Sequence, residues 1–170
     1  MEECISVFDM LKIGVGPSSS HTLGPWRAAE RFLKELRDEK ILESVTSIRV
    51  DLYGSLSLTG KGHATDYAVI LGLSGQDPVT IPIQNIDAIV QQVKKTHVLQ
   101  LGDEVPISFT PDTDIVFNKN FLPFHANGMT FTAMTDAGNH TNTYYSIGGG
   151  FVVVEERFNA KKNMEFKCAF

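Results

Sequence analysis

The residues that could do chemistry gather in short, glycine-rich loops. The first loop, GVGPSSSHTLGP, places Ser18, Ser19, Ser20 and His21 in a frame of glycine and proline. Serine hydroxyls directly before a helix either cap its first N–H groups or help to bind a ligand there. A histidine beside them adds a group that accepts and donates protons near neutral pH. On these residues alone, a structural cap and a binding site both remain open.

The second loop, GSLSLTGKGHATD, presents Lys61 and His63 just before a predicted helix. It is close to a phosphate-binding loop, which needs four residues between its first glycine and the Gly-Lys pair, followed by Ser or Thr. Here five residues intervene and Gly62 replaces the hydroxyl, so we exclude nucleotide binding. The start of a helix still favours an anion, because its N–H groups and its dipole attract negative charge.

Two further loops carry polar groups. LPFHANGMTF offers His125 and Asn127, and YYSIGGGF offers Ser146 followed by three glycines. Taken singly, each loop has a structural explanation, since glycine-rich turns and hydrogen-bonded histidines are common. Taken together, hydroxyls, a lysine and histidines in the loops of a core-like sequence indicate a site for a small anionic metabolite, such as an amino or hydroxy acid.

Early helices and late strands must position these loops. Residues 25–40 carry one apolar helical face, and residues 45–57 begin with the alternation of a half-buried strand. Residues 64–75 predict an apolar helix, residues 79–83 an edge strand, and residues 85–97 a surface helix capped by Asn85. Strand-like segments follow at 104–110, 113–118, 128–136, 142–147 and 150–157. We therefore predict an α+β fold, a mainly antiparallel sheet with helices packed on one face.

Composition and charge exclude several classes of protein. The 170 residues carry 15 Lys+Arg against 20 Asp+Glu, and the basic residues are scattered. Nucleic acid and membrane surfaces need a clustered basic face, so neither is an expected partner. No apolar run approaches the roughly 20 residues that span a bilayer, and the acidic start MEECISVFDM is unlike a signal peptide. Cys4 and Cys168, far apart in sequence, predict neither a disulfide framework nor a metal cluster, so we expect a soluble cytoplasmic protein.

Four motifs resemble a known family. SVFDMLKIGVGPSSSHTLGP, DLYGSLSLTGKGHATD, LPFHANGMTF and TYYSIGGGFVVVEE resemble, in this order, the iron–sulfur L-serine dehydratases of bacteria. The resemblance covers nearly the whole chain but only the first part of such an enzyme. It implies a serine dehydratase β domain at 1–157 and, at 158–170, the start of a linker to an absent α domain that holds a [4Fe–4S] cluster. It also implies a fold similar to the allosteric substrate-binding domain of D-3-phosphoglycerate dehydrogenase.

The reaction of this family implies roles for the loop residues. L-Serine becomes pyruvate and ammonia without pyridoxal phosphate, while iron acts as a Lewis acid on the serine hydroxyl. A base must remove the Cα proton, and we assign this role to His63, with His21 as the alternative. The neighbouring Lys61 disfavours a second positive charge and so keeps His63 neutral. The substrate-binding residues implied are Ser18, Ser19, Ser20, His21, Lys61, His125, Asn127 and Ser146, and no residue of this chain is expected to bind metal.

A different class of function stays open beside the enzyme. The alternative is a regulatory module that binds serine or dimerises and has no catalytic residue of its own. The two differ in where the substrate lies relative to the cluster. In either case we expect L-serine, the α domain and a second copy in a homodimer as partners, and no serine deamination by this chain alone.

Overall fold

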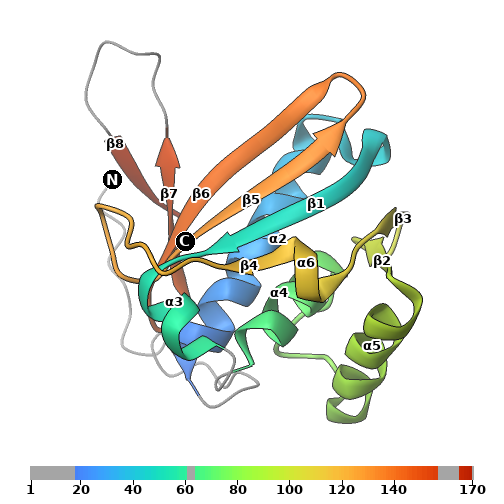
Figure 1. Ribbon diagram of the computed structural model, residues 1–170, viewed down its shortest axis with the longest axis horizontal. Coiled ribbons are helices and arrows are strands. Elements are labelled where there is room, and N and C mark those ends of the chain that lie inside the picture. The colour runs from blue at the N-terminus through green and yellow to red at the C-terminus, as the bar shows by residue number, and fades with distance from the viewer. Residues whose placement is uncertain (1–17, 61–63, 157–164, 170) are drawn as a thin grey trace.

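The described part of the chain forms one mixed sheet with helices packed against it. This computed structural model describes residues 18–60, 64–156 and 165–169. The sheet has eight strands in the order β2-β3-β1-β5-β6-β7-β8, with β4 also paired to β1 (Figure 1). The strands are β1 Val45–Leu52, β2 Val98–Leu101, β3 Val105–Ser108, β4 Ile115–Phe117, β5 Gly128–Thr135, β6 Gly138–Gly148, β7 Phe151–Glu156 and β8 Glu165–Ala169.

Most strand pairs are antiparallel. The pairs β2–β3, β1–β5, β5–β6, β6–β7 and β7–β8 run antiparallel, whereas β1 runs parallel to β3 and to β4. The predicted α+β fold with a mainly antiparallel sheet is therefore confirmed. The strand that begins at Val45 shares one sheet with the strands after Val105, as expected.

The central strand β1 has two faces of opposite character. Ile48, Val50 and Leu52 are buried, whereas Arg49 and Asp51 lie on the other face and form an ion pair. Successive side chains of a strand point to opposite faces, so the alternation in the sequence becomes an apolar face and a polar face.

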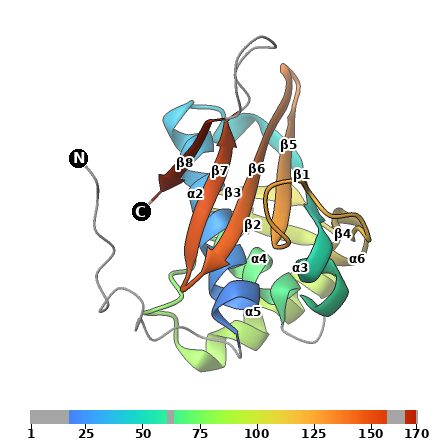
Figure 2. The same ribbon diagram turned by 90° about the vertical axis from the view of Figure 1, so that its left-hand side faces the viewer.

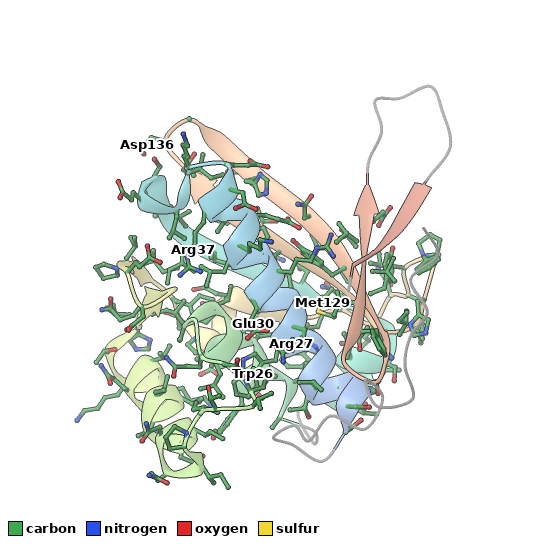
Figure 3. The ribbon with its side chains drawn as sticks, turned by 180° about the vertical axis from the view of Figure 1, so that it is seen from behind. Trp26, Arg27, Glu30, Arg37, Met129 and Asp136 are labelled. Atoms are coloured by element: carbon green, nitrogen blue, oxygen red, sulfur yellow. The ribbon has the colours of Figure 1, made fainter. Side chains whose placement is uncertain are left out.

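Helices cover the apolar face. Helix α2 packs across β5, β6 and β7, and α4 packs beside it against α2 and β2. Figure 2 and the rear view in Figure 3 show α2 lying along one side of the sheet. The helical segments are η1 Ser19–Leu23, α2 Gly24–Asp38, η2 Leu42–Ser44, α3 Gly54–Thr59, α4 Thr65–Leu73, α5 Ile83–Thr96 and α6 Pro111–Asp114.

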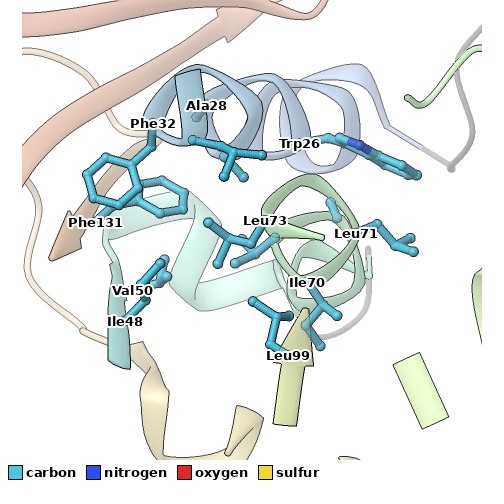
Figure 4. Packing of buried hydrophobic residues seen from close by; sticks show 14 of the residues in the cluster. Trp26, Ala28, Phe32, Ile48, Val50, Ile70, Leu71, Leu73, Leu99 and Phe131 are labelled. Atoms are coloured by element: carbon cyan, nitrogen blue, oxygen red, sulfur yellow. The ribbon is translucent and has the colours of Figure 1, made fainter. Parts of the chain in front are cut away.

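The core lies between α2, α4 and the sheet. Phe32 of α2 contacts Phe131 of β5, with 5.3 Å between ring centroids. Leu73 of α4 lies next to these rings, and Ile70 of the same helix lies beside Leu99 of β2 (Figure 4). The apolar face predicted for residues 25–40 is buried in full, at Trp26, Ala29, Phe32, Leu33 and Leu36. This packing gives α2 a fixed position, and the Ser-rich loop at its start is positioned with it.

Helices α2 and α4 approach each other most closely at Gly72. A Cβ built there would lie 2.7 Å from Ala29 Cβ and 2.7 Å from the main-chain oxygen of Trp26. Beside this crossing, the indole N–H of Trp26 donates to the main-chain oxygen of Gln76 at 2.7 Å. The two helices therefore leave no room for a side chain at position 72.

We expect Gly72→Ala to lower the free energy of unfolding by about 1–3 kcal/mol, because the added methyl overpacks this contact. Urea denaturation followed by circular dichroism measures the loss. The double variant Gly72→Ala/Ala29→Gly removes one of the two clashing groups and should recover part of it. An unchanged midpoint in the single variant would contradict the close helix contact.

The segment before α5 differs from its prediction. Residues 79–83 do not form an edge strand, because residues 78–80 form a turn and α5 begins at Ile83. The predicted cap at Asn85 is also wrong, since Pro82 occupies the N-cap position and Asn85 lies inside the first turn. Val79 and Ile83 are exposed, so this β-branched run has no sheet to bury it.

Several short elements were not predicted, among them η2, α6, α3, β2 and β8. Helix α3 forms within the GSLSLTG stretch, and β2 pairs with β3 at the sheet edge. Strand β8 pairs with β7 and lies within residues 158–170, which we interpret as the start of a linker. The structure therefore adds a strand to that segment.

Candidate functional site

The Ser-rich loop forms the start of the longest helix. Segment η1 runs directly into α2, so Ser19 begins a helical stretch that ends at Asp38. Ser18 precedes it in extended conformation, and among the described residues its side chain makes no capping bond; its Oγ lies 3.3 Å from Ser20 Oγ. Ser19 is exposed, whereas Ser18 and Ser20 are partly buried. The structural-cap interpretation of Ser18 therefore has no support.

The histidine of this loop links two loops. His21 Nδ1 lies 2.9 Å from Ser20 Oγ, and His21 Nε2 lies 3.0 Å from Ser55 Oγ at the start of α3. A neutral imidazole donates from one ring nitrogen and accepts at the other, so one serine donates to His21 while the other accepts from it. The partly buried imidazole is thus fixed between η1 and α3, which belong to two different sequence motifs.

The loop between β4 and β5 lies against the start of α3. The N–H of Gly54 donates to the main-chain oxygen of Asn120, and the N–H of Ser55 donates to that of Ala126, at 2.9 and 2.8 Å. Gly54 has a φ of 53°, and a Cβ there would lie 2.4 Å from the oxygen of Ala126. Only glycine fits this turn, which brings the second and third motifs together.

A carboxylate anchors the beginning of the same loop. Asn118 Nδ2 donates to Asp51 Oδ1 at 3.0 Å, and the Arg49 guanidinium donates to both oxygens of Asp51, at 2.8 and 2.9 Å. Burial acts to raise the pKa of Asp51, but these hydrogen bonds outweigh it and hold the pKa below its ordinary value. Asp51 is therefore ionised at neutral pH and keeps Asn118 in place.

His125 and Asn127 connect this loop to β6. The N–H of Asn127 donates to His125 Nδ1 at 3.1 Å, so a neutral His125 carries its proton on Nε2. Asn127 Nδ2 donates to the main-chain oxygen of Ser146 at 3.2 Å. In return, the N–H of Ser146 donates to the main-chain oxygen of Asn127. The third and fourth motifs are therefore joined by paired hydrogen bonds.

Ser146 joins the fourth motif to the first. Its side chain is fully buried, and its hydroxyl donates to the main-chain oxygen of Ser20 at 2.8 Å. Gly24 lies directly against it, since a Cβ at Gly24 would be 1.9 Å from Ser146 Oγ. The hydroxyl of Ser146 therefore holds the backbone of the Ser-rich loop in place.

Lys61 and His63 lie outside the described residues. The described chain ends before them at Gly60 and resumes after them at Ala64, which has a φ of 55°. The next residue, Thr65, is fully buried, and its hydroxyl donates to the main-chain oxygen of His21 at 2.6 Å. The segment that carries both predicted residues is therefore followed at once by a contact with the Ser-rich loop.

The arrangement suits a small anion that also offers hydrogen-bonding groups. The first N–H groups of a helix have no partner within the helix and attract negative charge, and η1 presents its start beside His21. The hydroxyls of Ser20 and Ser55 flank an imidazole that can accept or donate a proton. These groups can bind a carboxylate and move a proton.

The sequence analysis did not single out Ser55 or Thr65. Both belong to the motif DLYGSLSLTGKGHATD, and only their place in this motif could have indicated a role in the site. Their partners lie 34 and 44 residues away in the chain. Neither hydrogen bond leaves a periodic trace in the sequence.

The described residues contain neither a metal-binding cluster nor a helix that could span a membrane. Within residues 18–60, 64–156 and 165–169, no group of three or more His, Cys, Asp or Glu side chains could hold a metal ion. Over the same part of the chain, every helix is too short or too polar to cross a membrane.

Comparison with known proteins gives one family. The model of the serine dehydratase beta chain family matches residues 6–157. L-Serine dehydratase of Streptomyces coelicolor is 49% identical over 161 residues, which is 93% of this chain and 35% of that protein. L-Serine dehydratase 1 of Escherichia coli K12 is 47% identical over 91% of this chain, and the Haemophilus influenzae enzyme is 44% identical over 93% of it.

The chain spans about a third of the length of these relatives. The match with the family model includes all four loops that the described hydrogen bonds bring together, and Lys61 and His63 belong to the second of these loops. This chain therefore belongs to the serine dehydratase beta chain family.

Proposed function

We propose that this chain is the β part of an L-serine ammonia-lyase and supplies substrate-binding loops and a catalytic base. The observation that carries the proposal is the pair of hydrogen bonds from the His21 ring to Ser20 and to Ser55, at the place where all four family motifs meet. The relatives named L-serine dehydratase share this part of the chain at 44–49% identity.

The reaction needs a proton acceptor near the substrate Cα. Removal of the Cα proton and loss of the hydroxyl as water give 2-aminoacrylate, and its imine tautomer takes up water to yield pyruvate and ammonia. We propose that His63 removes the Cα proton, and we keep His21 as the alternative base. The preference for His63 is supported by the hydrogen bonds of His21. Both ring nitrogens of His21 already contact serine hydroxyls, which suits His21 to orient a hydroxyl or a carboxylate of the substrate.

The substrate-binding role falls to the loops around His21. The carboxylate of serine would bind at the start of η1, with Ser18, Ser19 and Ser20 beside it. Lys61 would add a positive charge, and His125, Asn127 and Ser146 complete the predicted set. Of these, Asn127 and Ser146 are buried, so they act by holding the loops in place.

The [4Fe–4S] cluster does not fit the described residues of this chain. Within them, no group of three or more His, Cys, Asp or Glu side chains could hold a metal ion; Cys4 lies outside the described residues, and Cys168 lies in β8. We therefore assign the cluster to the two thirds of the longer relatives that this chain does not cover.

The same resemblance supports three further proposals. We propose a homodimer, a cytoplasmic enzyme, and a fold similar to the allosteric substrate-binding domain of D-3-phosphoglycerate dehydrogenase. The cover of one sheet face by α2 and α4 is consistent with that fold.

A chimera tests the proposed function. This chain replaces the matched region of the Streptomyces coelicolor enzyme, and pyruvate formation from L-serine is measured together with iron and acid-labile sulfide. We expect the chimera to be active, and the 170-residue chain alone to be inactive and free of stoichiometric iron. A chain that alone binds a cluster and forms pyruvate would overturn the division into β and α parts.

A further inference from the structure

Pro25 cannot donate a hydrogen bond to the main-chain carbonyl four or five residues before it. In an α-helix the oxygen of His21 accepts from residue 25, and in a π-helix the oxygen of Ser20 does so. Proline has no N–H, so neither spacing can supply that bond. In η1 the N–H of Gly24 donates five residues back, to the oxygen of Ser19.

Two buried hydroxyls from distant elements donate to these two carbonyls. Thr65, the first residue of α4, donates to the oxygen of His21 at 2.6 Å, and Ser146 of β6 donates to the oxygen of Ser20 at 2.8 Å. Both residues are fully buried, at 0% exposure each. An unsatisfied carbonyl in such surroundings is costly, so both bonds hold the backbone firmly.

We propose that Thr65 is a positioning residue for His21. Its hydroxyl fixes the main chain of His21, and this fixes the imidazole in its bonds with Ser20 and Ser55. This inference rests on the proposed function for its catalytic consequence, but its structural claim stands apart from that function.

The surroundings of Thr65 leave its hydroxyl little freedom. A Cβ built at Gly60 would lie 3.1 Å from Thr65 Oγ1 and 3.2 Å from Thr65 Cβ, so the side chain is confined from that side. Thr65 also comes two residues after His63 in the chain. The bond therefore ties the helix that follows one predicted base to the backbone of the other.

The test compares three variants by NMR of the His21 ring in the 170-residue chain. Thr65→Val removes the hydroxyl and keeps the shape, Thr65→Ser keeps the hydroxyl, and Ser74→Ala removes another buried hydroxyl of the same chain, which donates to the main-chain oxygen of Ile70 at 2.8 Å. We expect Thr65→Val to shift the His21 ring signals and Thr65→Ser and Ser74→Ala to leave them in place.

Full-length enzyme carrying the same variants gives the second readout. We expect Thr65→Val to lower kcat about tenfold with a smaller change in KM, and Thr65→Ser to restore it. Unchanged His21 signals in Thr65→Val would overturn the inference. If Thr65→Val fails to fold, Thr65→Ser decides: displaced His21 signals in that variant would assign the effect to the lost methyl and also overturn it. Shifted signals with normal kcat would leave the positioning intact and refute the catalytic role of His21.

Discussion

Full-length enzyme carrying His63→Ala should lose about 10²-fold or more in kcat, with little change in KM for L-serine. A general base acts on the Cα proton in the transition state, so its loss slows the chemical step more than it weakens binding. Steady-state pyruvate formation measures both constants.

Two matched variants complete this experiment. Ser19→Ala should mainly raise KM, because an exposed hydroxyl at the start of η1 would bind ground state and transition state alike. His97→Asn replaces an exposed histidine in left-handed conformation at the end of α5 and should leave both constants unchanged. An active His63→Ala with an inactive His21→Ala would make His21 the base. If both histidine variants stay active and only the response to serine changes, the regulatory alternative is correct.

Gly24→Ala should destabilise the protein by about 3 kcal/mol and abolish serine deamination in the full-length enzyme. The new Cβ would lie 1.9 Å from Ser146 Oγ and 2.6 Å from Ser146 Cβ, so β6 and the start of α2 must move apart. That movement breaks the bond from Ser146 to the oxygen of Ser20. Chemical denaturation and pyruvate formation measure the two losses.

A compensating variant separates the two effects. Gly24→Ala/Ser146→Gly removes both clashing atoms and should recover much of the stability. Activity should stay low, because the hydroxyl that holds Ser20 is absent from the double variant. Wild-type stability in Gly24→Ala alone would show that β6 does not lie against η1.

Periodic patterns predicted the elements that bury one face. The apolar stripe of residues 25–40 and the alternation from Val45 to Leu52 both arise from one-sided burial. The helix and the strand both formed, but the strand predicted for residues 45–57 ends at Leu52, and residues 54–57 lie in α3. The strand predicted for residues 79–83 was wrong, because a run of β-branched residues becomes a strand only where it can pair with a sheet. Strand β2 was missed although β3 is equally short, because β2 follows directly after His97, the C-cap of α5, and no Gly, Pro, Asn or Asp marks its start.

The candidate site was predictable in part. Its histidine, serines and asparagine stand out in glycine-rich loops, and the resemblance gathered them into four motifs. The partnership of His21 with Ser55 and Thr65 could not be predicted, because it depends on how α3 and α4 lie against η1. That placement follows from tertiary packing and leaves no local signal.

The bond between Ser146 and Ser20 closes a loop of 126 residues. Closing so long a loop costs conformational entropy before any contact compensates it, and such contacts form late during folding. Helix α2 can form early from its own residues, but the backbone of Ser20 gains its hydroxyl partner only after β6 has joined the sheet. During synthesis, Ser146 leaves the ribosome 126 residues after Ser20. We therefore expect the substrate-binding loops to be the last region to become protected from hydrogen exchange during refolding.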